Sequence, residues 1–274
     1  MADADADTSD DQRRVHAAIE RLKKHPVLSV VLFASLIAGA VGTLLTTLGS
    51  GAGLLSDLTN PHKEQYAALG NLDLDVRFEY FEENFGTVKS VVDPCPTPEL
   101  CPDTGDEPLQ LYIHETEQLT VRALFEGNAL RAYLVTTRDA DFSPSVTWLG
   151  QDLGVLGHAD VESMLAVATV EPTDTSFAWG AQWISYVEVV AAGAPANYRG
   201  FLLAWAPEGV QTDLDANSAV ELGEHHEMSA ATLAELRAGT TPNTFGEFRD
   251  DGAVGAWLRD ADVVQGLLFA NSES

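Results

Sequence analysis

The chain has 274 residues, of which 15 are Lys or Arg and 42 are Asp or Glu, and its formal net charge is −27. A surface this negative repels phosphate backbones, which argues against nucleic acid as a partner. The same acidity is typical of proteins from a high-salt habitat and of chains from GC-rich genomes, and composition does not separate the two.

The first 26 residues combine an acidic start with a basic stretch. Residues 2–7 alternate Ala and Asp, a low-complexity pattern that predicts disorder. Residues 13–24 then predict a basic amphipathic helix beside a membrane. Its basic residues are Arg13, Arg14, Arg21, Lys23 and Lys24.

Residues 26–56 contain no charged side chain, and Val27–Leu48 is almost wholly apolar. At about 1.5 Å of rise per residue this segment reaches about 33 Å, enough to cross a hydrocarbon core of about 30 Å. A buried core helix would carry a polar face, which this segment lacks. A cleaved signal peptide usually has a shorter apolar region nearer the N-terminus. We therefore expect one transmembrane helix, Val27–Leu48.

The orientation of this span follows from its flanking charges. Five basic residues precede it, whereas Lys63 alone follows within 20 residues. Because basic flanks stay in the cytoplasm, we expect a single-pass protein of the cell membrane with a cytoplasmic N-terminus and an extracytoplasmic soluble domain.

Small residues recur every fourth position inside the span. Ala34, Ala38 and Gly42 form one such stripe. In lipid, close approach of two backbones along small residues is a main source of helix association, so the stripe predicts a weak homodimer. The alternative is that small residues are simply common in spans.

Beyond the span, we expect a linker over residues 49–70 and a soluble domain over 71–270. An aromatic and aliphatic stripe at helical spacing comprises Leu74, Phe78, Phe81 and Phe85. It predicts a core helix over residues 74–85, begun by Asp73 or Asp75 and ended by Gly86.

Two cysteines, Cys95 and Cys101, lie in a Pro-rich loop. Outside the cytoplasm such a pair indicates a disulfide, with free thiols as the alternative. A metal site is disfavoured, because two cysteines without a neighbouring His make a poor ligand set.

From residue 109 the pattern changes to short alternating runs, which predict strands. These runs are residues 109–114, 118–125, 129–137, 181–190 and 198–206. Turn signals at Glu126–Asn128 and Gly193–Asn197 predict two hairpins, and Ser229 and Gly239 bound a predicted helix. The tail, residues 252–268, fits a helix or a strand. The fold class is therefore α+β, with an antiparallel sheet of about five strands and packed helices.

Several short segments resemble the central strands of an uncharacterised bacterial family, the ETEC-type domain. They are Thr120–Ala123, Ala132–Thr137, Phe142–Pro144, Tyr186–Glu188, Gly193–Tyr198 and Asn243–Gly246. The resemblance spans about residues 70 to 250 and implies a single-pass anchored protein with one soluble domain. The family implies no activity and therefore no catalytic residue.

One acidic segment partly fits a twelve-residue calcium loop. Its oxygen-bearing residues at ligand positions are Asp213, Asp215, Asn217, Glu221 and Glu224. The position that needs Gly for the sharp turn is Ser218, and the segment Ala206–Gly209, with its Pro and Gly, breaks the chain where the incoming helix belongs. A solvated acidic loop is the simpler interpretation.

The sequence contains no complete catalytic or cofactor motif. His114-Glu115 and His226-Glu227 begin like the zinc-protease helix motif, but each lacks the second His one turn later. We therefore predict a membrane-anchored binding or interaction module of the cell envelope, with an unknown protein partner and no cofactor. The alternative is an extracytoplasmic hydrolase with a site assembled from distant residues.

Overall fold

The computed structural model describes residues 62–270 apart from 96–100, 180–182, 193–197 and 216–228. The chain divides into two compact units, Met1–Lys63 and Glu64–Ser274, and nearly all described residues belong to the second. The predicted span, the basic stretch before it and the stripe Ala34, Ala38 and Gly42 lie outside the described residues. Within those residues, no helix is long and apolar enough to cross a bilayer.

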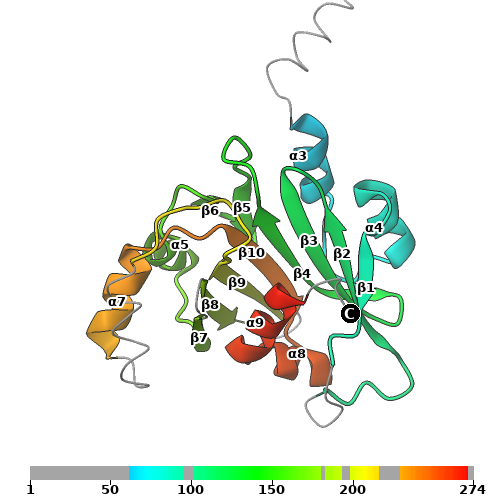
Figure 1. The fold of residues 1–274 in the computed structure, drawn as a ribbon. Helices are drawn as coiled ribbons and strands as arrows, with labels where there is room; N and C mark the ends of the chain where they lie inside the picture. Colours follow the sequence, from blue (N-terminus) through cyan, green and yellow to red (C-terminus); the bar gives the residue numbers. More distant parts are fainter. Residues whose placement is uncertain (1–61, 96–100, 180–182, 193–197, 216–228, 271–274) are drawn as a thin grey trace, which may run out of the picture. The chain divides into compact units, whose positions relative to one another are not determined.

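The described residues of the second unit form an α+β fold built on one antiparallel sheet of eight strands (Figure 1). Their spatial order is β1-β2-β3-β4-β10-β9-β8-β7, and a separate hairpin pairs β5 with β6. The strands are β1 Ser90–Val92, β2 Leu109–Glu115, β3 Leu119–Glu126, β4 Ala129–Thr137, β5 Ser145–Trp148, β6 Gln151–Val155, β7 Asp174–Trp179, β8 Ile184–Ala191, β9 Arg199–Trp205 and β10 Thr244–Arg249. The α+β class with an antiparallel sheet is confirmed, whereas about five strands was too low a number.

Helices cover both faces of this sheet. They are α3 Lys63–Gly70, α4 Phe78–Phe85, α5 Val161–Ala168, α7 Ala230–Ala238, α8 Gly252–Leu258 and α9 Ala261–Phe269. On β9, Phe201 and Leu203 belong to the core that contains the aromatic rings of α4, and Leu202 and Ala204 belong to the core beneath α8 and α9. Because both faces are buried, the central strands read as nearly continuous apolar runs.

The predicted meander of β2, β3 and β4 is present, and its second turn is the predicted hairpin. Gly127 at this turn has φ +59°, and a Cβ there would meet the carboxylate of Glu107. Gly adopts this positive φ without the steric cost that a Cβ would bring. The predicted β8–β9 pair also forms, although its turn, residues 193–197, lies outside the described residues.

The helix predicted over residues 74–85 begins only at Phe78, so its predicted start was wrong. The N–H of Asp75 donates to the carbonyl of Leu130 at 2.9 Å, which holds this stretch beside the start of β4. Asp75 itself has φ +67°, which is incompatible with a helix. The side chain of Asn128 accepts from the N–H of Phe78 at 3.1 Å and replaces the expected Asp cap. The helix ends at Gly86, as predicted.

Two further local predictions have clear outcomes. The Ser229 hydroxyl accepts from the N–H of Thr232 at 3.1 Å and begins α7, which Gly239 ends, as predicted. By contrast, α3 lies within residues 49–70, which we assigned to a linker.

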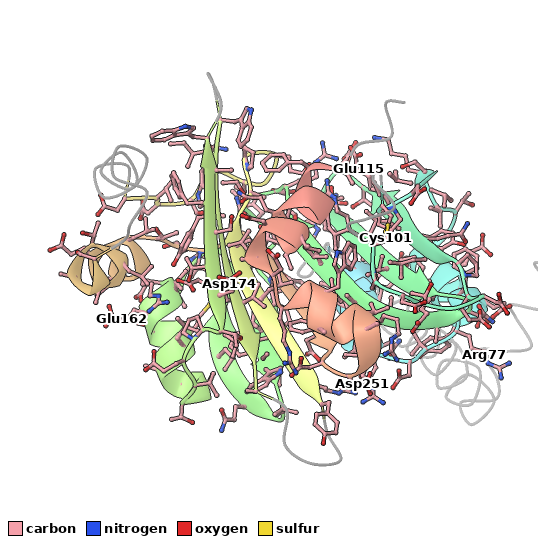
Figure 2. The ribbon with its side chains drawn as sticks, turned by 90° about the horizontal axis from the view of Figure 1, so that it is seen from below. Arg77, Cys101, Glu115, Glu162, Asp174 and Asp251 are labelled. Atoms are coloured by element: carbon pink, nitrogen blue, oxygen red, sulfur yellow. The ribbon has the colours of Figure 1, made fainter. Side chains whose placement is uncertain are left out.

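The C-terminal tail folds as two helices, α8 and α9. The carboxylate of Asp174, at the start of β7, accepts from the N–H of Ala261 at 2.9 Å and so holds the first turn of α9 against the sheet edge (Figure 2). A carboxylate at a helix N-terminus is favourable because the first N–H groups have no partner within the helix. This contact joins residues 87 positions apart, which local pattern does not reveal.

Candidate functional site

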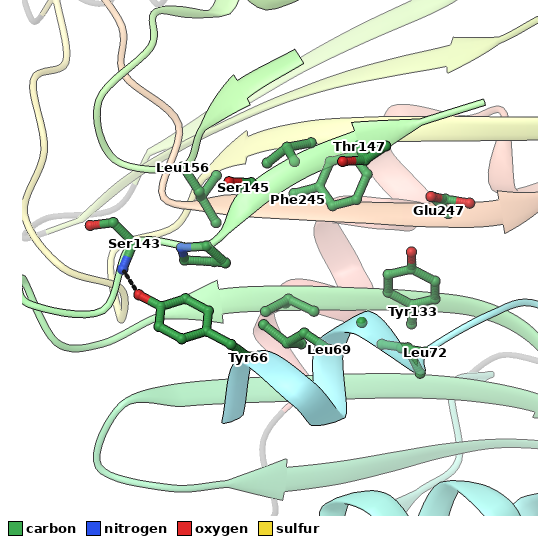
Figure 3. A pocket seen from close by; sticks show the side chains of 14 residues that line it. Tyr66, Leu69, Leu72, Tyr133, Ser143, Ser145, Thr147, Leu156, Phe245 and Glu247 are labelled. Carbon is green, nitrogen blue, oxygen red and sulfur yellow. Dashed lines mark hydrogen bonds between the residues drawn. The ribbon is translucent and has the colours of Figure 1, made fainter. Parts of the chain in front are cut away.

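A pocket of about 580 Å³ opens between α3, the sheet and the β5–β6 hairpin (Figure 3). It is lined by Tyr66, Leu69, Gly70, Leu72, Tyr133, Val135, Ser143, Pro144, Ser145, Val146, Thr147, Leu156, Phe245 and Glu247. We call it the α3 pocket. Its lining comes from segments far apart in the chain, which the sheet brings together.

The floor of the α3 pocket is a block of two cross-strand pairs. Val135 lies opposite Phe245, and Tyr133 lies opposite Glu247, where β4 pairs with β10. Alternate residues of a strand point to the same face, so these four side chains project together toward α3. The pocket therefore depends on the insertion of β10 beside β4.

A carboxylate closes one end of the floor. The Tyr133 hydroxyl points toward Glu247 (Figure 3), and Arg199 Nη1 lies 3.3 Å from Glu247 Oε2. Arg199 Nη2 also lies 2.6 Å from Asp73 Oδ1. Burial raises the pKa of Glu247, and the charge of Arg199 opposes this shift. Burial likewise raises the pKa of the Tyr133 hydroxyl well above its ordinary value, and the charge of Glu247 adds to the shift.

The other end of the α3 pocket carries hydroxyl groups. The N–H of Ser143 donates to the Tyr66 hydroxyl at 3.2 Å, and the Tyr66 ring lies 4.8 Å from that of Phe142. The Ser143 hydroxyl lies 3.1 Å from Nε2 of His158. Ser143 is thus held between a ring of α3 and a His that follows the β5–β6 hairpin.

Between these ends the wall combines apolar side chains with the hydroxyl groups of Ser145 and Thr147 (Figure 3). Leu69 and Leu72 line it from the α3 side, while Leu156 and Phe245 lie across from them (Figure 3). Among the described residues that line the pocket, Glu247 has the one charged side chain. The arrangement can hold an apolar or aromatic body with a polar group at either end.

Comparisons with family models, with curated proteins and with solved structures find no match. The site is therefore interpreted from its own geometry.

A second buried carboxylate, Glu188 on β8, lies outside this pocket and has a full set of partners. Arg237 of α7 reaches both of its oxygens, at 2.7 Å from Nε and 3.1 Å from Nη2. The Thr175 hydroxyl donates at 2.6 Å, and Tyr186 donates to the other oxygen. The Glu188 side chain is 0% exposed. This cluster fastens α7 to the sheet.

The predicted calcium loop is only partly described. Asp213 accepts from the N–H of Thr241 through its carbonyl at 2.8 Å, and the side chain of Asp215 lies beside Gly239. Asn217, Glu221 and Glu224 lie outside the described residues. Within those residues, no group of three or more His, Cys, Asp or Glu could hold a metal ion. Calcium binding stays a prediction.

The two cysteines lie close together in space. Burial, together with a hydrogen bond that the Cys95 thiol donates to Cys101 and the negative charge of the Cys101 thiolate, raises the pKa of the Cys95 thiol to about 12. Both cysteines are free thiols in this structure, and the disulfide stays a prediction.

No residue of the α3 pocket was predicted as a site from sequence. Five of its lining residues lie in three segments on which the family resemblance was based, Ala132–Thr137, Phe142–Pro144 and Asn243–Gly246, and the resemblance itself stays a prediction. The five residues are Tyr133, Val135, Ser143, Pro144 and Phe245. The segments are separated by up to about a hundred residues, and their meeting depends on the position of β10 between β4 and β9.

Proposed function

We propose that the chain is a membrane-anchored binding module of the cell envelope, and that its second unit takes its ligand in the α3 pocket. The apolar segment Val27–Leu48 and the basic residues before it support the anchor and the extracytoplasmic orientation. The α3 pocket supports binding.

The observation that carries this proposal is the form of the pocket. Its volume of about 580 Å³ lies within the range of small-molecule sites, about 300–1,000 Å³. Its lining combines apolar and aromatic side chains with several hydroxyl groups and one carboxylate. The site therefore suits recognition of a small molecule or of one side chain of a protein partner.

Blocking the mouth of the pocket tests this proposal. Thr147 lines the pocket and is exposed, so Thr147→Trp should fill it without disturbing the core. Ligand-observed NMR with indole, 2-phenylethanol and phenethylamine should detect binding to the wild type and loss of binding in the variant. Val167→Trp is the matched control, because Val167 is 47% exposed on α5 and is not part of the lining. Equal binding by Thr147→Trp and the control would reject the α3 pocket as the site.

The anchor and the orientation need separate experiments. The full chain should resist alkaline extraction from membranes, and a C-terminal tag should be digested by protease added outside intact cells while an N-terminal tag is protected. Cys95 and Cys101 should resist thiol labelling until they are reduced. Release by alkali, or protection of the C-terminal tag, would contradict the proposed topology.

A hydrolase is the second candidate, and the pair Ser143 and His158 favours it. A hydroxyl 3.1 Å from an imidazole nitrogen is the geometry of a nucleophile and its general base. Among the described residues, no carboxylate hydrogen-bonds to His158, so the geometry supports binding better than catalysis. A fluorophosphonate probe tests the alternative: labelling that requires both Ser143 and His158 would replace the binding module by a hydrolase.

A further inference from the structure

The charges at the closed end of the α3 pocket do not balance. Asp73 and Glu247 are both acidic, and Arg199 is the cation that pairs with both of them. Arg199 lies nearer to Asp73, at 2.6 Å, than to Glu247, at 3.3 Å. The three groups therefore carry one negative charge in excess, and it falls mainly on Glu247.

The carboxyl group of Glu247 is largely removed from water. Its side chain is 9% exposed, and the exposed part faces the pocket that it lines. Taking a carboxylate out of water costs free energy unless a cation and hydrogen bonds replace the water. Burial raises the pKa of Glu247, which is the direction expected of an incompletely paired acid. A cation that entered the pocket would complete its pairing.

The rest of the pocket favours an apolar body attached to such a cation. Leu72 and Phe245 lie on the Glu247 side of the pocket, and Leu69 and Leu156 continue its apolar surface toward Ser143 (Figure 3). Aromatic faces also attract cations within about 6 Å. The net charge of −27 raises the local concentration of cations and lowers that of anions around the whole chain.

From this geometry we propose that the α3 pocket binds a small organic cation, a protonated amine on an apolar or aromatic body, with its ammonium group at Glu247. This inference rests on the proposed binding function and adds the chemical class of the ligand. An anionic ligand would place two negative charges together, and a neutral ligand would leave Glu247 without a second cation.

Three probes of one shape separate these classes. Isothermal titration of the full chain in lipid nanodiscs with phenethylamine, 2-phenylethanol and phenylacetate compares a cation, a neutral molecule and an anion on the same ring. We expect phenethylamine to bind at least tenfold more tightly than 2-phenylethanol, and phenylacetate not to bind. Added salt should weaken the binding of the amine and leave that of the alcohol unchanged.

Two variants assign the preference to Glu247. Glu247→Gln should weaken the binding of phenethylamine at least tenfold and leave that of 2-phenylethanol unchanged. Glu117→Gln is the control: it removes an exposed charge that is not part of the lining and should change the binding of neither probe. Thr147→Lys places a fixed cation at an exposed position of the lining and should weaken the binding of phenethylamine but not that of 2-phenylethanol. This variant leaves the buried residues around Glu247 unchanged.

Each outcome separates the ligand class from the binding function. If the amine and the alcohol bind equally and both are lost in Thr147→Trp, the pocket is a binding site but the cation proposal is overturned. If none of the three probes binds the wild type, both proposals fail. If the amine binds equally to the wild type, Glu247→Gln and Thr147→Lys, its site lies elsewhere and the proposal is overturned.

Discussion

Two glutamates of the same sheet, Glu188 on β8 and Glu247 on β10, are buried on the same face but have different surroundings. Glu188 has an Arg that contacts both oxygens and two hydroxyl donors, and no part of its side chain is exposed. Glu247 shares its Arg with Asp73 and faces a pocket. A buried acid whose Arg contacts both of its oxygens belongs to the packing of the fold, whereas one that shares its Arg beside a cavity indicates a place for a ligand.

The largest expected effect comes from removing the cation of the closed cluster. Arg237→Met leaves the charge of Glu188 buried without its partner and should lower the free energy of unfolding by about 3–5 kcal/mol. Chemical denaturation of the full chain in detergent measures this loss. Lys89→Met is the control, because Lys89 pairs with Glu115 at the surface and is 51% exposed, so the loss there should stay below about 1 kcal/mol. Equal losses in the two variants would show that Arg237→Met does not leave Glu188 as an unpaired buried charge.

A matched pair of Tyr variants gives an intermediate effect. Tyr186→Phe removes a hydroxyl that donates to Glu188 in a closed site and should cost about 1.5–3 kcal/mol, the range for hydrogen bonds to charged groups. Tyr133→Phe should cost less, because solvent that enters the α3 pocket can hydrate Glu247 in place of the lost hydroxyl. The same denaturation experiment compares the two. A greater loss in Tyr133→Phe would remove the distinction between a closed and an open cluster.

The smallest effect is a pH dependence at Glu247. Its folded pKa lies above the ordinary value of 4.5 because burial disfavours the charged form. Below pH 4.5 the carboxyl is protonated in both the folded and the unfolded chain, so it imposes no penalty. The penalty on folding develops as the pH rises through 4.5 and is complete above the folded pKa.

Glu247→Gln removes this penalty. The free energy of unfolding of the variant should therefore increase relative to that of the wild type as the pH rises from about 4 to 8. Denaturation at a series of pH values measures the difference, and the curve for Glu117→Gln should run parallel to that of the wild type. A difference that shrinks as the pH rises would mean that Arg199 outweighs burial and that Glu247 is fully paired.

Some of the fold is encoded in short stretches of sequence. Glu126-Gly127-Asn128 predicts the β3–β4 hairpin, and Ser229 and Gly239 predict the ends of α7. Each prediction is confirmed because the backbone conformation or the hydrogen bond involved lies within a few residues. The start of α4 was mispredicted because its cap, Asn128, lies 50 positions away.

The candidate site was beyond prediction from sequence for the same reason. Arg199 and Asp73 are 126 positions apart, and Glu247 meets Tyr133 only because β10 pairs with β4. In sequence, one carboxylate among 42 acidic residues carries no signal of its burial.

By itself, the sequence determined the charge of the chain, the apolar segment Val27–Leu48, the α+β class and those turns and helix ends whose partners are close neighbours. The tertiary structure decided which strand lies between β4 and β9, which acids are buried and which of them faces a cavity. The physical reason is range: turns, caps and periodicity depend on a few consecutive residues, whereas strand order and the desolvation of a side chain depend on the packing of the whole sheet.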